Sequence, residues 1–166
     1  MIELSVVVLL IGMMLLIAVP RVRDTLLNDS LRAAVRHLIG TARDLRNEAV
    51  REQVDYVLQI DLNGQAFWSY TADATAEKQA ALRKTGLRFP EGVRVTGVRH
   101  AGEAGKADGD ASIRFFRRGY AEPTVVFLAK DERTFTLVFN PFLQAVTIYE
   151  KRVDFFFNEA DRAASY

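Results

Sequence analysis

The chain has 166 residues, which is enough for one domain together with an N-terminal anchor segment. It contains no cysteine, which excludes disulfides, thiolate metal sites and cysteine nucleophiles. The formal net charge of +1 gives no overall attraction towards nucleic acid or anionic membranes.

The N-terminus carries an apolar run over residues 4–19, uncharged and with Ser5 as its one hydroxyl. A helix of this length covers about 24 Å, slightly less than the ~30 Å hydrocarbon core of a bilayer. Met1 and Ile2 bring it close to that thickness. Glu3 places a carboxylate at the start of the run, where an acidic group in the membrane costs several kcal/mol of free energy unless it is paired. Glu3 is therefore a candidate functional residue.

Three interpretations of this run are open: a cleaved signal peptide, a buried helix of a soluble protein, and a membrane helix that continues into a soluble domain. A signal peptide would carry a basic region before the run and a small-residue cleavage site after it. Here no Lys or Arg precedes the run, and Pro20-Arg21-Val22-Arg23 follows it. We favour the membrane helix. The sequence has no second apolar run of this length, which excludes a multi-span protein.

Residues 2–12, which read IELSVVVLLIG, together with Pro20 resemble the N-terminal segment of type IV pilin-like proteins and pseudopilins. The resemblance implies an inner-membrane subunit that is drawn into a helical fibre. It assigns Glu3 to neutralising the terminal amine of an adjacent subunit and Pro20 to kinking the helix. In that family a prepilin peptidase cuts a basic leader after Gly and before Phe, and the new N-terminus is methylated. Met1 stands where the third mature residue would be, so we expect the natural precursor to start upstream.

After Pro20 an amphipathic pattern resumes and predicts one helix over about residues 3–52. Charged residues occupy its other side, and we interpret the apolar face as domain core. That face recurs at steps of three or four: Leu27, Leu31, Val35, Leu38, Ala42, Leu45 and Ala49. The predicted organisation is a transmembrane and assembly helix over 1–23, its amphipathic soluble continuation over 24–53, a β-rich head over 54–158 and a tail over 159–166.

From Val54 the apolar period changes to two, which predicts strands. A hairpin is expected around Asn63-Gly64. Residues 71–86 predict an exposed loop with helical turns over 76–83, and residues 101–111 a mobile loop. Phe155, Phe156 and Phe157 predict a tail that docks on the sheets or meets a partner. Further strands are expected over residues 87–89, 93–98, 112–117, 124–128, 134–139 and 145–150.

The predicted fold class is therefore α+β. A long N-terminal helix packs on an antiparallel, two-sheet, β-sandwich-like head of about seven or eight short strands. We expect the soluble half of the helix to pack on one sheet. Residues 113–119, 135–138 and 146–148 are similar to the C-terminal hairpins of the GspH-type minor pseudopilin of type II secretion, with Arg118 where that family usually has an acidic residue.

Catalytic and metal chemistry have little support in the sequence. His37 and His100 lie in no metal-ligand spacing. The stretches 61–64 and 108–110 contain too few oxygen ligands for a Ca²⁺ site, so we interpret both as turns. The sequence contains no nucleophile elbow, P-loop or kinase motif. We expect no enzyme and no cofactor.

Arg114, Arg117 and Arg118 are the candidate nucleic-acid contacts, because they lie near Phe115, Phe116 and Tyr120 and combine charge with stacking. Acidic residues are interleaved with the basic ones between positions 83 and 118. A solvated mixed surface therefore explains these arginines better than nucleic-acid binding does.

The function we expect is that of a structural minor pseudopilin. It would span the inner membrane once, hold its head in the periplasm, and assemble through its helix with other pilin-like subunits and a secretion-system platform. Two alternatives stay open. One is a type IV minor pilin for pilus assembly or DNA uptake, and the other is a single-pass membrane protein with an unrelated β-domain.

Overall fold

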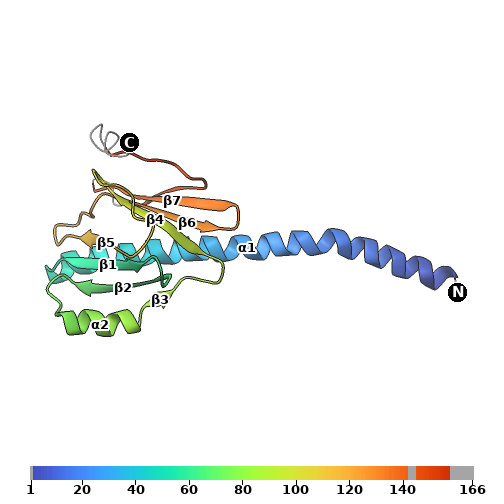
Figure 1. Ribbon diagram of the computed structural model, residues 1–166, viewed down its shortest axis with the longest axis horizontal. Coiled ribbons are helices and arrows are strands. Elements are labelled where there is room, and N and C mark those ends of the chain that lie inside the picture. The colour runs from blue at the N-terminus through green and yellow to red at the C-terminus, as the bar shows by residue number, and fades with distance from the viewer. Residues whose placement is uncertain (1, 142–144, 158–166) are drawn as a thin grey trace.

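The computed structural model describes residues 2–141 and 145–157, with the side chains of residues 2–4 and 15–29 outside the description. A long helix leads into eight strands and one short helix (Figure 1). The elements are α1 (Ile2–Glu52), β1 (Tyr56–Asp61), β2 (Ala66–Thr71), α2 (Ala76–Lys84), β3 (Leu87–Arg88), β4 (Arg94–His100), β5 (Asp110–Phe115), β6 (Thr124–Lys130), β7 (Arg133–Phe139) and β8 (Thr147–Tyr149).

The strands form two antiparallel sheets of four strands each, which confirms the α+β class and the expected number of strands. The first sheet has the order β3-β2-β1-β5 and the second the order β4-β6-β7-β8. Strand β4 lies between β3 and β5 in the sequence but belongs to the other sheet. In Figure 1 the second sheet lies above the C-terminal half of α1 and the first sheet below it, and α2 lies beyond β2 and β3.

The C-terminal half of α1 is anchored by the apolar face that its periodicity predicts. Its buried positions follow the helical repeat and include Leu31, Val35, Leu38, Ala42, Leu45 and Ala49, with Ala34 beside them. Leu27 lies outside the described side chains.

A hydrogen bond joins the last residue of α1 to the first residue of β1. The Tyr56 hydroxyl donates to the Glu52 carboxylate over 2.5 Å, which raises the pKa of Tyr56 to about 12.

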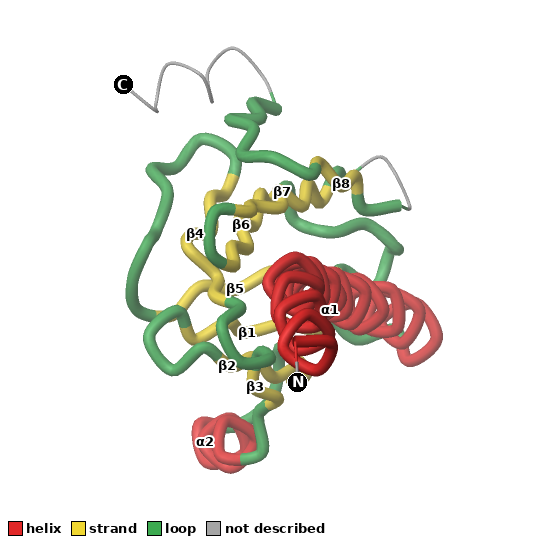
Figure 2. The backbone as a smooth tube through the Cα atoms, turned by 90° about the vertical axis from the view of Figure 1, so that its right-hand side faces the viewer, coloured by secondary structure: helices red, strands yellow, loops and turns green. Residues whose placement is uncertain are grey.

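The helix contacts both sheets, so the expectation that it packs on a single sheet is wrong. It touches β1 and β5 of the first sheet and β6 of the second. Its buried side chains share one apolar cluster with Leu58 and Ile113 of the first sheet and with Val126 and Leu137 of the second. The view along the helix shows α1 beside the place where the sheets meet (Figure 2).

The predicted hairpin is present, with a longer loop than a two-residue Asn-Gly turn. Asp61 pairs with Ala66, which leaves four loop residues, 62–65. The residue with positive φ is Gln65 (φ 50), not Asn63 or Gly64. The Asp61 carboxylate shapes the loop by accepting the main-chain N–H groups of Asn63 and Gly64.

Local contacts order the segment before β3 and the segment after β4. The helical turns predicted over 76–83 are confirmed as α2, whose first turn is capped by the Thr75 hydroxyl. In the loop expected over 101–111, Lys106 exchanges two main-chain hydrogen bonds with Val98 of β4, at 2.8 and 2.9 Å. Strand β5 begins at Asp110, two residues earlier than expected.

Residues 150–157, called the C-terminal strap below, dock on the second sheet, as predicted for the three phenylalanines. Phe155 and Phe157 pack on the small apolar cluster of Val125, Phe127 and Val138. These three side chains lie on the face of the sheet that points away from the main core. The strap therefore covers an apolar surface that would otherwise meet water.

Candidate functional site

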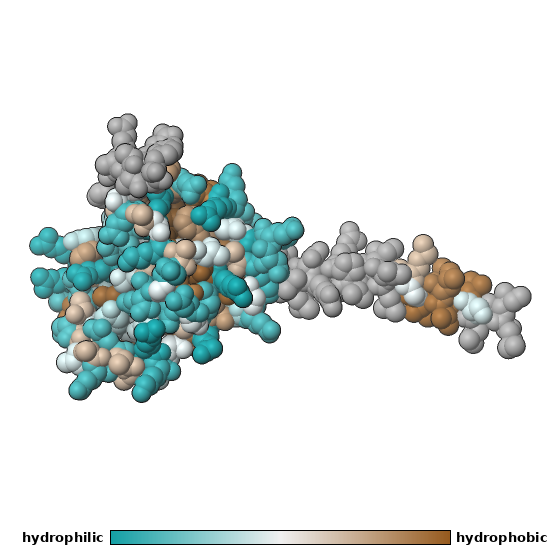
Figure 3. Space-filling view, viewed as in Figure 1, coloured by the Kyte–Doolittle hydropathy of each residue, from teal (hydrophilic) through white to brown (hydrophobic). Residues whose placement is uncertain are grey.

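The N-terminal part of α1 exposes a segment that is almost entirely apolar. Residues 5–14, called the apolar segment below, contain Ser5 and Gly12 as their only residues that are not large and hydrophobic. The exposed fraction of its large hydrophobic side chains runs from 51% for Val6 to 77% for Met14, so the head leaves these side chains uncovered. Figure 3 shows them as a hydrophobic band far from the head. An apolar surface of this kind marks a site that lipid or another protein covers.

The two residues predicted to act in assembly stand on either side of this segment, Glu3 two residues before it and Pro20 six residues after it. The side chains of Glu3 and Pro20 lie outside the described residues, so the ion pair expected of Glu3 and the kink expected at Pro20 stay predictions. Within the part of the chain that is described, no helix is both long and apolar enough to cross a membrane.

Polar contacts fix the helix where it enters the head. The ammonium of Lys130, the last residue of β6, donates to the Ser30 hydroxyl over 2.7 Å. Arg32 pairs with Glu150 of the strap at 3.2 Å, although both side chains are exposed, so the ion pair contributes little energy. Leu31, one residue after Ser30, is the first buried side chain of α1 among those that the structure describes. These contacts tie this turn of α1 to β6 and to the strap.

A groove runs beside α1 on the side of β8. Its volume is ≈ 340 Å³. Most of its lining is apolar, and Ile148 on its rim is 46% exposed. Burial lowers the pKa of Arg46 in its wall. The described residues that line it are Ile39, Ala42, Arg43, Arg46, Ala145, Val146 and Ile148.

The three arginines predicted as nucleic-acid contacts are exposed, one on β5 and two in the turn that follows it. Arg114 lies on β5 and lines a polar hollow of ≈ 480 Å³ with Tyr70, Gln79 and Glu122. Arg117 and Arg118 follow in the turn after β5, and Asp55 accepts the main-chain N–H of Arg117 at 3.0 Å. Burial in the hollow raises the pKa of Tyr70.

The aromatic residues of this turn are already engaged with each other. The rings of Phe116 and Tyr120 stack at 4.4 Å between centroids. Phe115 is fully buried in the main core. The stacking surfaces that a nucleic acid would use are therefore partly or wholly occupied within the chain.

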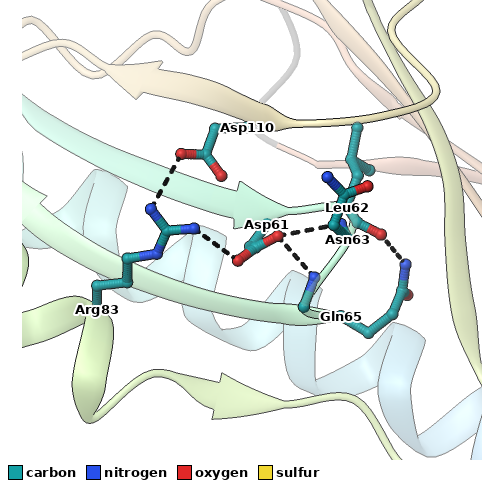
Figure 4. A network of polar contacts seen from close by, with 7 residues as sticks. Asp61, Leu62, Asn63, Gln65, Arg83 and Asp110 are labelled. Carbon is teal, nitrogen blue, oxygen red and sulfur yellow. Dashed lines mark hydrogen bonds and ion pairs between the residues drawn. The ribbon is translucent and has the colours of Figure 1, made fainter.

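A carboxylate–guanidinium network joins the β1–β2 hairpin, α2 and β5 (Figure 4). Arg83 contacts Asp61 at 2.9 Å and Asp110 at 3.6 Å, and it lies 5.4 Å above the ring of Trp68. The Gly64 N–H, followed by the Arg83 hydrogen bond, lowers the pKa of Asp61. The network confirms the turn interpretation of residues 61–64. Among the described residues, no three Asp, Glu or His side chains group as metal ligands.

Both histidines contact neighbouring side chains of the head. The exposed His37 ring lies 5.6 Å from that of Phe67. His100 Nδ1 lies 3.1 Å from the Thr124 hydroxyl and 4.0 Å from Glu122.

Sequence reasoning missed Gln65, whose side chain links the two sheets by binding the main chain of Val95. No sequence pattern identifies a polar residue that will bind the main chain of a distant strand.

These features define a class of protein: a helix whose N-terminal part projects from a head of two four-stranded antiparallel sheets. No family model and no curated protein sequence matches the chain. A crystal structure of the minor pseudopilin EpsH from the type II secretion system of Vibrio cholerae matches with a TM-score of 0.54 and 13% identity, over 76% of this chain and 97% of that one. A second EpsH structure matches with a TM-score of 0.49 and 11% identity, over 69% and 98%. The chain thus has the GspH-type pseudopilin fold.

Proposed function

We propose that the protein is a structural subunit of a pilus-like fibre, a minor pseudopilin of a type II secretion system. The observation that carries this proposal is the apolar segment, which extends from a head with the fold of EpsH and which the head leaves uncovered. A soluble monomer would gain nothing from such a surface. Packing of neighbouring helices, or lipid before assembly, would remove it from water.

In this proposal α1 is one continuous helix whose two parts have different functions. Residues 31–49 anchor the helix in the head, and Lys130 of β6 binds Ser30 beside the first of them. The N-terminal part spans the inner membrane once before assembly and lies in the fibre core afterwards. The head lies in the periplasm. The role is structural rather than catalytic.

The partners follow from the same picture. They are other pilin-like subunits through helix packing, the inner membrane, the assembly platform of the secretion system and, for the natural precursor, a prepilin peptidase that exposes an N-terminus for methylation. Glu3 is the proposed partner of the terminal amine of a neighbouring subunit, because opposite charges attract strongly where water is excluded.

Cysteine cross-linking tests the role of the apolar segment, because the chain has no cysteine of its own. Leu9→Cys places one thiol on the segment, and Lys78→Cys places one on exposed α2 as a control. Each variant is produced with the other pilin-like subunits of the same genome, themselves carrying a cysteine in their apolar helices. We expect disulfide-linked heterodimers with Leu9→Cys and none with Lys78→Cys. A full chain that stays monomeric and soluble without detergent would contradict the proposal.

We do not propose DNA binding, the alternative function. Arg114 shares its hollow with Glu122, and the nearby aromatic rings stack on each other. A gel-shift assay at low salt checks this choice. Binding that weakens with salt and disappears when Arg114, Arg117 and Arg118 are replaced together by Gln would favour a DNA-binding minor pilin instead.

A further inference from the structure

The tip of the β1–β2 hairpin carries an exposed Asn63-Gly64 pair that the proposed function does not use. This pair is chemically labile in a flexible chain. The Gly64 nitrogen, after losing its proton to a solvent base, can form a bond to Cγ of Asn63. The bond from Cγ to the side-chain nitrogen then breaks and ammonia leaves with a proton from solvent. One water molecule opens the resulting cyclic imide to aspartate or isoaspartate.

The folded hairpin places a carboxylate directly on the nitrogen that would attack. The Gly64 N–H donates to Asp61 Oδ1 over 2.7 Å, and the Asn63 N–H donates to the same oxygen over 3.0 Å. Arg83 holds the other oxygen at 2.9 Å (Figure 4). The carboxylate is therefore fixed from both sides.

The fit also explains why glycine stands at position 64, where φ is not in the left-handed range. A Cβ on residue 64 would lie 2.7 Å from Asp61 Oδ2 and 3.0 Å from its Cγ. A Cβ atom does not approach another atom as closely as 2.7 Å, so the carboxylate occupies the space that a side chain would need. A side chain at position 64 would therefore displace the Asp61 carboxylate from its place on the loop amides, and glycine lets it stay there.

We propose that Asn63 is a latent deamidation site, which the Asp61 carboxylate protects in the folded protein. A hydrogen bond to an anion stabilises the N–H form of Gly64. Loss of that proton would place an amide anion beside a carboxylate, and two like charges at this distance repel each other. The nucleophile is thus suppressed while the hairpin is closed and released when its tip opens.

Modification would act on the same hairpin. A new carboxylate at position 63 would add a second negative charge to the loop whose amides the Asp61 carboxylate binds. An isoaspartate would lengthen the main chain within the loop. Either product weakens the closed tip that protects the site, so the modified chain would not return to the original structure.

Peptide mapping by mass spectrometry tests the proposal on the full chain in detergent, incubated in mildly alkaline buffer with and without urea. We expect Asn63 to convert at least about tenfold more slowly in the folded wild type than in urea, the effect of about 1.4 kcal/mol on a barrier. Asp61→Ala should raise the folded rate towards the urea rate. Asp73→Ala, at an exposed aspartate of another loop, should leave it unchanged. Asn140 precedes Pro141, which has no N–H, and serves as an internal reference.

Equal rates with and without urea in the wild type would overturn the proposal. So would an unchanged rate in Asp61→Ala when circular dichroism shows an intact fold. Should Asp61→Ala not fold, Asp61→Asn removes the charge and keeps the size, and the same increase in rate is required of it. None of these readouts depends on fibre assembly, so failure here leaves the proposed function untouched.

Discussion

The side-chain amide of Gln65 pairs with the main chain of Val95 and joins the two sheets of the head. Its Oε1 accepts the Val95 N–H over 2.7 Å, and its Nε2 lies 3.3 Å from the Val95 carbonyl oxygen. Val95 lies on β4, an edge strand that pairs with β6 on its other side. The amide thus occupies the position that a neighbouring strand would take. Gln65 is held in place by its own main chain, whose carbonyl accepts the N–H of Phe89.

Replacement of Gln65 by Leu should destabilise the head more than its partial exposure suggests. The buried main-chain groups of Val95 would lose their partners, which costs about 1–3 kcal/mol. Urea unfolding followed by circular dichroism measures the free energy of unfolding. Gln53→Leu is the control, because Gln53 is exposed and bonds only within its own turn. Equal losses in the two variants would show that the link between the sheets contributes nothing.

Local patterns predicted most of the elements, because their causes lie within a few residues. The apolar repeat that includes Leu38 and Leu45 identifies the packed face of α1, and alternation identifies the strands. Asn63-Gly64 correctly marks a hairpin. Its loop is longer than the dipeptide predicts because the Asp61 carboxylate folds back onto the loop amides.

Long-range placement could not be predicted in the same way. Nothing local tells β4 to join β6 rather than a neighbour in sequence, and nothing in the helix repeat indicates that both sheets touch it. The Gln65–Val95 contact depends on both of these outcomes. Of the candidate site residues, the side chains of Glu3 and Pro20 lie outside the described residues. The arginines 114, 117 and 118 are present at the surface but divided between a strand and a turn.

Thr136→Val should loosen the C-terminal strap without disturbing the sheet. The Thr136 hydroxyl donates to the Lys151 carbonyl over 2.8 Å and accepts the Val153 N–H over 3.1 Å, and valine has the same shape without either bond. We expect a loss of about 1–2 kcal/mol and faster hydrogen exchange at Val153. Thr134→Val, on the same strand and the same face, is the matched control. Unchanged exchange at Val153 would mean that the phenylalanines alone hold the strap.

Asp61 should make the head sensitive to acid. Its folded pKa is lowered, first by the Gly64 N–H and then by Arg83. The stabilisation is therefore complete above the unfolded pKa of about 3.9 and is lost as the pH falls through the lower, folded value. Asp61→Asn should be less stable than the wild type at neutral pH and should lose less stability on acidification. Denaturation curves measured across this pH range check the prediction, and parallel curves for the two proteins would contradict it.

Substitutions of Glu3 distinguish two contributions to assembly, the charge of its carboxylate and the packing of the apolar helices. The head is built without residue 3, so Glu3→Ala and Glu3→Gln should leave its circular dichroism unchanged. Both should abolish the cross-link that Leu9→Cys reports, because an unpaired terminal amine of the neighbour would be stranded away from water. Glu3→Asp keeps the charge and should retain a measurable part of the cross-link. If Glu3→Gln cross-links as well as the wild type, the carboxylate is not the partner of that amine, and the apolar segment alone must drive the helices together.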